Sequence, residues 1–124
     1  DWLGSRPRPE RLLFRVAVRE VEAWLLADAV GMATLLGSRA RVTARPEALL
    51  DPKAELLRLA RRAPRAVRDD LLADRGAISY QGLGYNHRLC AFVRTTWDPD
   101  RASRRSQSLA SARQRLQELV SREP

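Results

Sequence analysis

The stretch that decides the fold runs from Leu12 to Asp28 and reads LLFRVAVREVEAWLLAD. Residues 12–18 are almost continuously apolar, and a charged step follows at residues 19–22. A helical pattern of apolar residues then begins at Val21. A short apolar run before a charged step is typical of a buried strand that delivers acidic side chains at its carboxyl end. Open α/β sheets bind ligands and metals at that end of their strands.

The strand is expected over residues 11–18, and the rest of the chain predicts about five helices. We expect these helices over residues 20–36, 51–62, a short stretch after Pro64, 85–96 and 109–120. Asp51 is a suitable N-cap with Pro52 at the first helical position, and Gly37 suits a helix end. A single buried strand does not form a sheet alone, so it must pair with missing strands or with another subunit.

The predicted fold class is therefore α/β and helix-rich. Residues 1–10 are rich in proline and arginine and are expected to be an extended lead-in. Residues 11–124 are expected to form a single domain, because the chain is of single-domain length and no linker interrupts it.

The net charge is strongly positive, at +8. Of the 23 basic residues, Lys53 is the only lysine and the others are arginine. Arginine favours bidentate contacts with phosphate, so the charge predicts a nucleic-acid partner. A high-GC coding bias is the alternative reason for arginine over lysine, although it does not explain the excess of positive charge. The best candidates for phosphate contact are Arg101, Arg104 and Arg105, and the alternative for their segment is a solvated linker.

The sequence also predicts a cytoplasmic protein without a membrane partner. No apolar run reaches the length of a membrane-spanning helix, and the N-terminal residues lack a signal-peptide core. The single Cys90 excludes an internal disulfide and suits a reducing compartment.

Three acidic residues near the charged step are candidates for catalysis or metal binding: Glu20, Glu22 and Asp28. On a helix Glu20 and Glu22 would point about 200° apart, so they cannot share one face. The alternative for Glu22 is an acid favoured by the helix dipole or paired with Arg19. Asp28 falls on the apolar stripe, where a carboxylate needs a partner or a cation. It is equally suited to capping a helix that follows it.

The segment Ala17–Asp28, AVREVEAWLLAD, resembles the signature of a bacterial family known as the domain of unknown function 4276 family. Shorter matches follow in the family's order along the chain. They are Pro46-Glu47, Asp51-Pro52-Lys53, Leu59-Ala60-Arg61-Arg62, Arg68-Asp69-Asp70-Leu71, Gly82-Leu83-Gly84-Tyr85, Phe92-Val93, Trp97, Pro99 and Ser106-Gln107-Ser108-Leu109. The resemblance extends approximately over residues 11–120.

The resemblance implies the C-terminal part of a Toprim-like domain, distantly similar to RloB-like and OLD-type nucleases of phage defence. In Toprim domains an early glutamate and a D-x-D element bind the metals, and no D-x-D precedes Glu20 here. The implied function is therefore part of a metal-dependent nuclease that is inactive alone. Glu22 and Glu20 would be catalytic, and Glu22 and Asp28 would bind Mg²⁺ or Mn²⁺.

The expected partners follow from this interpretation. They are nucleic acid, an ATPase or the missing N-terminal half of the family's domain, and a second copy of the chain. An alternative function of a different class is a non-catalytic module that binds nucleic acid or protein. A third alternative is a structural fragment without activity.

Overall fold

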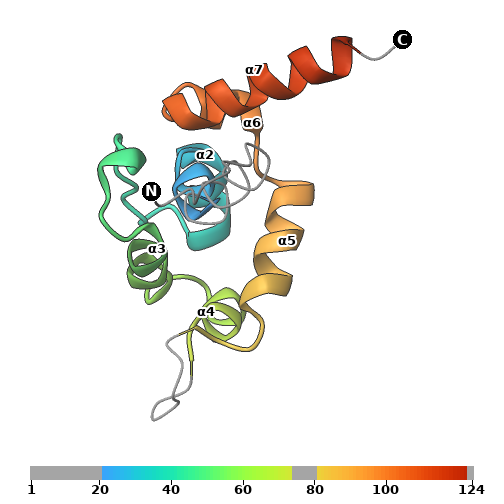
Figure 1. Ribbon diagram of the computed structural model, residues 1–124. Helices are drawn as coiled ribbons and strands as arrows, with labels where there is room; N and C mark the ends of the chain where they lie inside the picture. Colours follow the sequence, from blue (N-terminus) through green and yellow to red (C-terminus); the bar gives the residue numbers. More distant parts are fainter. Residues whose placement is uncertain (1–20, 74–80, 123–124) are drawn as a thin grey trace, which may run out of the picture.

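The computed structural model describes residues 21–73 and 81–122, which form an assembly of short helices (Figure 1). A first helical segment spans residues 21–26. The elements that follow are α2 (Ala29–Leu36), the 3-10 helix η1 (Pro46–Ala48), α3 (Pro52–Ala60), α4 (Arg65–Leu71), α5 (Tyr85–Thr95), α6 (Pro99–Ser103) and α7 (Gln107–Ser121). Helix α4 contacts both α3 and α5, and α6 leads into α7 (Figure 1).

The predicted α/β fold class is wrong. The described residues contain helices and no strand, and their only β-type pairing is an isolated antiparallel bridge between Leu72 and Gln81. The described residues therefore do not show a Toprim-like sheet. The strand predicted over residues 11–18 lies outside the described residues. The α/β class depended on that one predicted strand, whereas the described residues that follow it are organised as helices.

Local capping signals fix where several helices begin. The Asp51 side chain accepts a hydrogen bond from the backbone N–H of Ala54 (3.0 Å), and Pro52 opens α3, as predicted. Asp98 caps α6 in the same way, with Pro99 at the first position. Gly37 ends α2 with a φ of 100°, a conformation that side chains with a Cβ rarely adopt. The predictions at Asp51 and Gly37 are confirmed.

The helix predicted over residues 20–36 is divided at residues 27 and 28. The first segment ends at residue 26, and α2 begins at Ala29. Asp28 caps α2, since its side chain accepts a hydrogen bond from the backbone N–H of Gly31 (3.0 Å). The capping alternative considered for Asp28 is therefore the one that the structure shows.

The hydrophobic core draws side chains from most of the helices. Its buried members are Leu25, Leu26, Met32, Leu36, Leu56, Leu59, Ala60, Ala63, Val67, Leu71, Tyr85, Leu89 and Phe92. A smaller cluster joins Ala27, Ala102 and Leu109. Trp97 is partly buried and packs against both clusters, so it connects α6 and the start of α7 with the main core.

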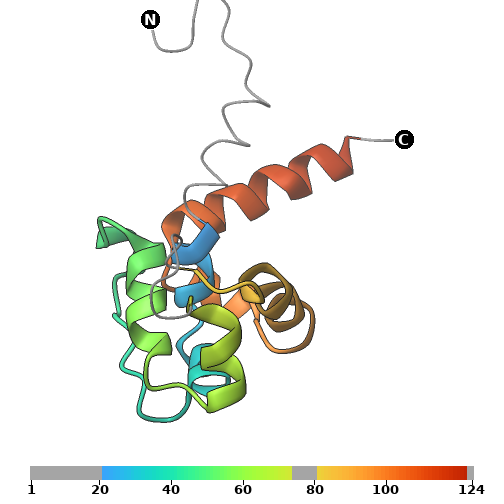
Figure 2. The ribbon, with the colours of Figure 1, turned by 90° about the horizontal axis from the view of Figure 1, so that it is seen from below.

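Helix α7 extends away from the other helices along most of its length (Figure 2). Leu109 near its start is buried, whereas Leu116 and Val120 are 61% and 72% exposed. The other described helices therefore cover the apolar side chains only at the start of α7.

Candidate nucleic-acid interface

Glu22, a predicted catalytic residue, lies on the first helical segment and contacts α5. Its Oε1 accepts a hydrogen bond from the hydroxyl of Tyr85 (3.0 Å). Burial raises the pKa of that hydroxyl, and the negative charge of Glu22 raises it further, so Tyr85 remains a protonated donor. The observed role of Glu22 is to connect the first helical segment with α5. Glu20 lies outside the described residues.

Asp28, a predicted metal ligand, is fully buried and accepts hydrogen bonds on both carboxylate oxygens. Arg101 binds it in a bidentate manner, with Nε 2.8 Å from Oδ1 and Nη2 3.0 Å from Oδ2. The backbone N–H of Asp98 donates to Oδ2 (2.8 Å), and that of Gly31 donates to Oδ1. Burial alone would raise the pKa of Asp28, but these hydrogen bonds and the Arg101 charge lower it below its ordinary value.

The structure gives the two described carboxylates separate partners. Glu22 contacts Tyr85, whereas Asp28 joins α2 to α6 through Arg101 and Asp98. In the described ranges, no group of three or more His, Cys, Asp or Glu side chains is arranged to hold a metal ion. Binding of Mg²⁺ or Mn²⁺ stays a prediction from the resemblance.

The three predicted phosphate-binding arginines separate into two groups. Arg101 lies against Asp28 and also contacts Asp98, so its guanidinium is used within the protein. Arg104 and Arg105 are exposed and form no ion pair with the described residues. With Arg45 they line a shallow hollow of about 600 Å³ between η1 and the connection from α6 to α7. We call Arg45, Arg104 and Arg105 the arginine patch.

The backbone beneath the patch is held on both sides. Arg105 follows α6, and its N–H donates to the carbonyl of the buried Ala102 (3.0 Å). The next residue, Ser106, is also buried and caps α7 by accepting from the N–H of Leu109 (3.2 Å). Arg104 and Arg105 therefore project into solvent from a turn whose backbone is anchored.

The residue that holds this turn, Glu47, was not among the predicted site residues. Its Oε1 accepts hydrogen bonds from the Ser106 hydroxyl (2.6 Å) and from the N–H and hydroxyl of Ser108 (both 2.7 Å). The indole N–H of Trp24 donates to the same Ser108 hydroxyl (2.8 Å). The Ser-x-Ser pattern before an apolar stripe is a capping signal, but no local pattern indicates a glutamate some sixty residues away as its partner.

These contacts predict how stability depends on pH. Burial would raise the pKa values of Asp28 and Glu47, but their hydrogen bonds lower both below the ordinary values of 3.8 and 4.5. A carboxyl with a lowered folded pKa stabilises the protein above its unfolded pKa, and this contribution is lost as the pH falls through the folded value. We therefore expect the free energy of unfolding to fall steeply below about pH 4.

Urea unfolding monitored by circular dichroism, at pH values from about 6 down to about 3, measures this dependence. Asp28→Asn removes one of the two titrating groups. Its free energy of unfolding should be lower than that of the parent near pH 6 but should fall less steeply as the pH decreases. Equal slopes for parent and variant would contradict the assignment to Asp28.

Comparison with protein-family models, curated proteins and solved structures finds no match to this chain. Across residues 21–73 and 81–122, no helix combines the length and apolar character that crossing a bilayer requires. The arginine patch and the contacts of the carboxylates are therefore the observations from which a function is inferred.

Proposed function

We propose that this chain is a nucleic-acid-binding module that contacts the phosphate backbone through the arginine patch. The observation that carries the proposal is that Arg45, Arg104 and Arg105 surround one hollow and lack acidic partners in the described part of the chain. Arginine side chains without an acidic partner can donate the N–H groups of their forked guanidinium to phosphate oxygens.

The distribution of acidic residues supports the proposal. Most of the described carboxylates form ion pairs with arginine, namely Asp28, Glu55, Asp69, Asp70, Asp98 and Asp100. Glu47 lines the same hollow as the patch, but its Oε1 accepts three hydrogen bonds from serine groups. The excess of positive charge is thus left on exposed arginines, where it can attract a polyanion.

Asp28 and Glu22 already have hydrogen-bond partners within the protein. We therefore favour nucleic-acid binding over metal-dependent cleavage as the proposed function. Asp28 would have to leave Arg101 and two backbone donors before it could coordinate a cation. Glu22 is hydrogen-bonded to a buried tyrosine on α5. Phosphate binding by the patch requires no such rearrangement.

The dependence of affinity on salt tests the proposal. Each phosphate contact releases condensed counterions and contributes roughly 0.7 to 0.9 to the slope of log K against log salt. Replacing Arg45, Arg104 and Arg105 together with glutamine should therefore flatten the slope by roughly two to three units. Fluorescence anisotropy with labelled single- and double-stranded oligonucleotides, between low and physiological salt, measures the slope.

A matched control changes three exposed arginines that do not line this hollow, Arg62, Arg65 and Arg68, to glutamine. This variant has the same net charge as the patch variant, and its slope should remain close to that of the parent. Equal flattening in both variants would show diffuse attraction rather than a site. Absence of binding by the parent at low salt would overturn the proposal altogether.

A further inference from the structure

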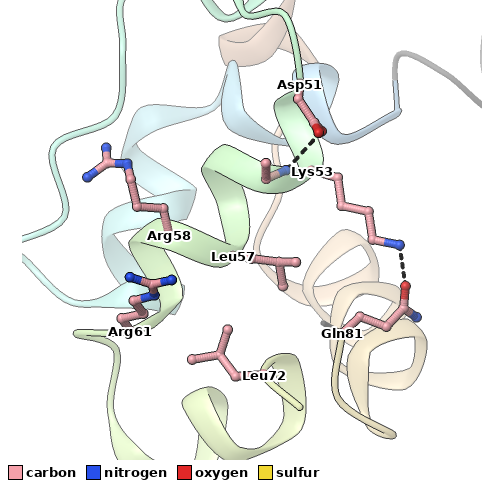
Figure 3. A pocket seen from close by; sticks show the side chains of 8 residues that line it. Asp51, Lys53, Leu57, Arg58, Arg61, Leu72 and Gln81 are labelled. Carbon is pink, nitrogen blue, oxygen red and sulfur yellow. Dashed lines mark hydrogen bonds between the residues drawn. The ribbon is translucent and has the colours of Figure 1, made fainter. Parts of the chain in front are cut away.

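A second hollow lies along α3, beside the bridge between Leu72 and Gln81 (Figure 3). It has a volume of about 600 Å³ and shares no lining residue with the arginine patch. Volumes of this order are typical of sites for small organic ligands. We call this hollow the α3 groove.

The floor of the α3 groove is apolar and short. It is formed by Ala54 and Leu57 of α3 and by Leu72 from the end of α4. Figure 3 shows Leu57 and Leu72 between the basic side chains of the two sides. A surface made of three small or medium-sized aliphatic side chains suits one planar ring system rather than a long aliphatic chain.

One side of the groove carries Lys53, the only lysine of the chain. Its ammonium donates a hydrogen bond to Oε1 of Gln81 and lies 5.1 Å from the centroid of the Tyr85 ring. The compact ammonium suits this position between an amide and an aromatic face. Because an ammonium has three N–H donors, Lys53 retains donor capacity while its position is fixed.

The opposite side carries two guanidinium groups, those of Arg58 and Arg61 (Figure 3). Glu55 fixes Arg58 through two hydrogen bonds, of 2.6 and 2.8 Å. Arg61 forms no ion pair with the described residues. Asp51 is the one acidic residue of the lining, so the groove as a whole is positively charged.

We propose that the α3 groove binds a nucleoside phosphate, either free or as the terminal nucleotide of a strand. The base lies on Leu57 and Leu72, and the phosphate accepts hydrogen bonds from Arg61. The polar edge of the base faces Lys53 and Asp51, where donors and a carboxylate oxygen are available. The guanidinium and the mixed polar groups lie on opposite sides of the apolar floor, as the phosphate and the polar edge of the base lie at opposite ends of a nucleotide.

Isothermal titration calorimetry at low salt tests the site, with each of the common nucleoside 5′-monophosphates, the matching nucleosides and inorganic phosphate. At least one monophosphate should bind saturably, and more tightly than its nucleoside or inorganic phosphate. Arg61→Gln should weaken this binding roughly ten- to a hundredfold, because it removes a charge-assisted hydrogen bond. Arg62→Gln, an exposed neighbour that does not line the groove, is the control and should leave the affinity unchanged.

Oligonucleotides with and without a 5′-phosphate distinguish the two sources of the ligand. Tighter binding of the phosphorylated strand that depends on Arg61 assigns the groove to a strand terminus, and dependence seen only with monophosphates assigns it to a free nucleotide. The inference fails if no monophosphate binds saturably, if inorganic phosphate binds as tightly, or if Arg61→Gln and Arg62→Gln have the same effect. The patch variant should retain monophosphate binding, so this site and the proposed function can fail separately.

Discussion

Replacing Asp28 with alanine should lower the free energy of unfolding by about 3 to 5 kcal/mol. The change removes a fully buried carboxylate that caps α2 and joins it to the start of α6. It also leaves Arg101 without its main partner. Because small domains are stable by only about 5 to 15 kcal/mol, much of the population should unfold under mild denaturant.

Urea unfolding followed by circular dichroism measures the loss, with two comparison variants. Asp28→Asn keeps the shape and an acceptor for the α2 cap but removes the charge, so its loss should be smaller than that of Asp28→Ala. Asp69→Asn disrupts an exposed ion pair with Arg65 (3.7 Å) and should change stability by less than about 1 kcal/mol. Equal effects of Asp28→Ala and Asp69→Asn would show that the buried pair is not a stabilising contact.

The sequence predicted the features that depend on neighbouring residues. Asp51-Pro52 indicated the start of α3, and Gly37 indicated the end of α2. Asp98-Pro99 is a local signal of the same kind, and Asp98 caps α6. In each case the signal is a side chain that satisfies backbone groups within one helical turn, so it can be found without knowledge of the fold.

The features that depend on distant residues were not predictable in this way. Asp28 required either a cation or a partner, and its partner Arg101 is 73 residues away. Arg101 had been assigned to phosphate contact because it lies in a basic segment. A sequence without aligned homologues does not show which buried acid pairs with which arginine. The contact between Asp28 and Arg101 therefore bears on two predictions, metal binding by Asp28 and phosphate contact by Arg101.

Several of the shorter motifs that carry the family resemblance meet in the described structure. Glu47 contacts Ser106 and Ser108, and Ser108 contacts Trp24 of the first segment. Tyr85, from the Gly-x-Gly-Tyr motif, contacts Glu22. These hydrogen bonds join the ends of helices to one another. A structural role therefore explains the presence of these residues without any role in catalysis.

The fold-class error has a different origin. The α/β class depended on the apolar run at residues 12–18 alone, since no second strand was predicted, and that run lies outside the described residues. Helix α3, which begins with a capping signal, was closer to its observed bounds: it was expected over residues 51–62 and spans Pro52–Ala60. Capping residues indicate a helix specifically, whereas an apolar run without them does not specify the type of secondary structure.

Replacing Gly82 with alanine should destabilise the protein by roughly 1 to 3 kcal/mol or more, because no space exists for a side chain. A Cβ at this position would collide with the carbonyl oxygen of Asp70 and would lie 2.6 Å from that of Leu72. Both obstacles are backbone atoms, which cannot move away as a flexible side chain would. Gly82 also donates its N–H to the carbonyl of Leu71 (2.8 Å), and this bond holds the start of α5 against the end of α4.

The same change should weaken ligand binding in the α3 groove, because Gln81 precedes Gly82 and accepts the Lys53 hydrogen bond. Thermal and urea unfolding measure the first effect, and calorimetry with a nucleoside monophosphate measures the second. Leu83→Ala is the control, since the Leu83 side chain is fully exposed beside the same turn and its removal should leave both quantities unchanged. A Gly82→Ala protein as stable as the parent would mean that the close approach of α4 to this turn does not hold in solution. Stability lost with monophosphate affinity intact would instead separate the turn from the groove, because the contact between Gln81 and Lys53 would then not be needed to position the ammonium.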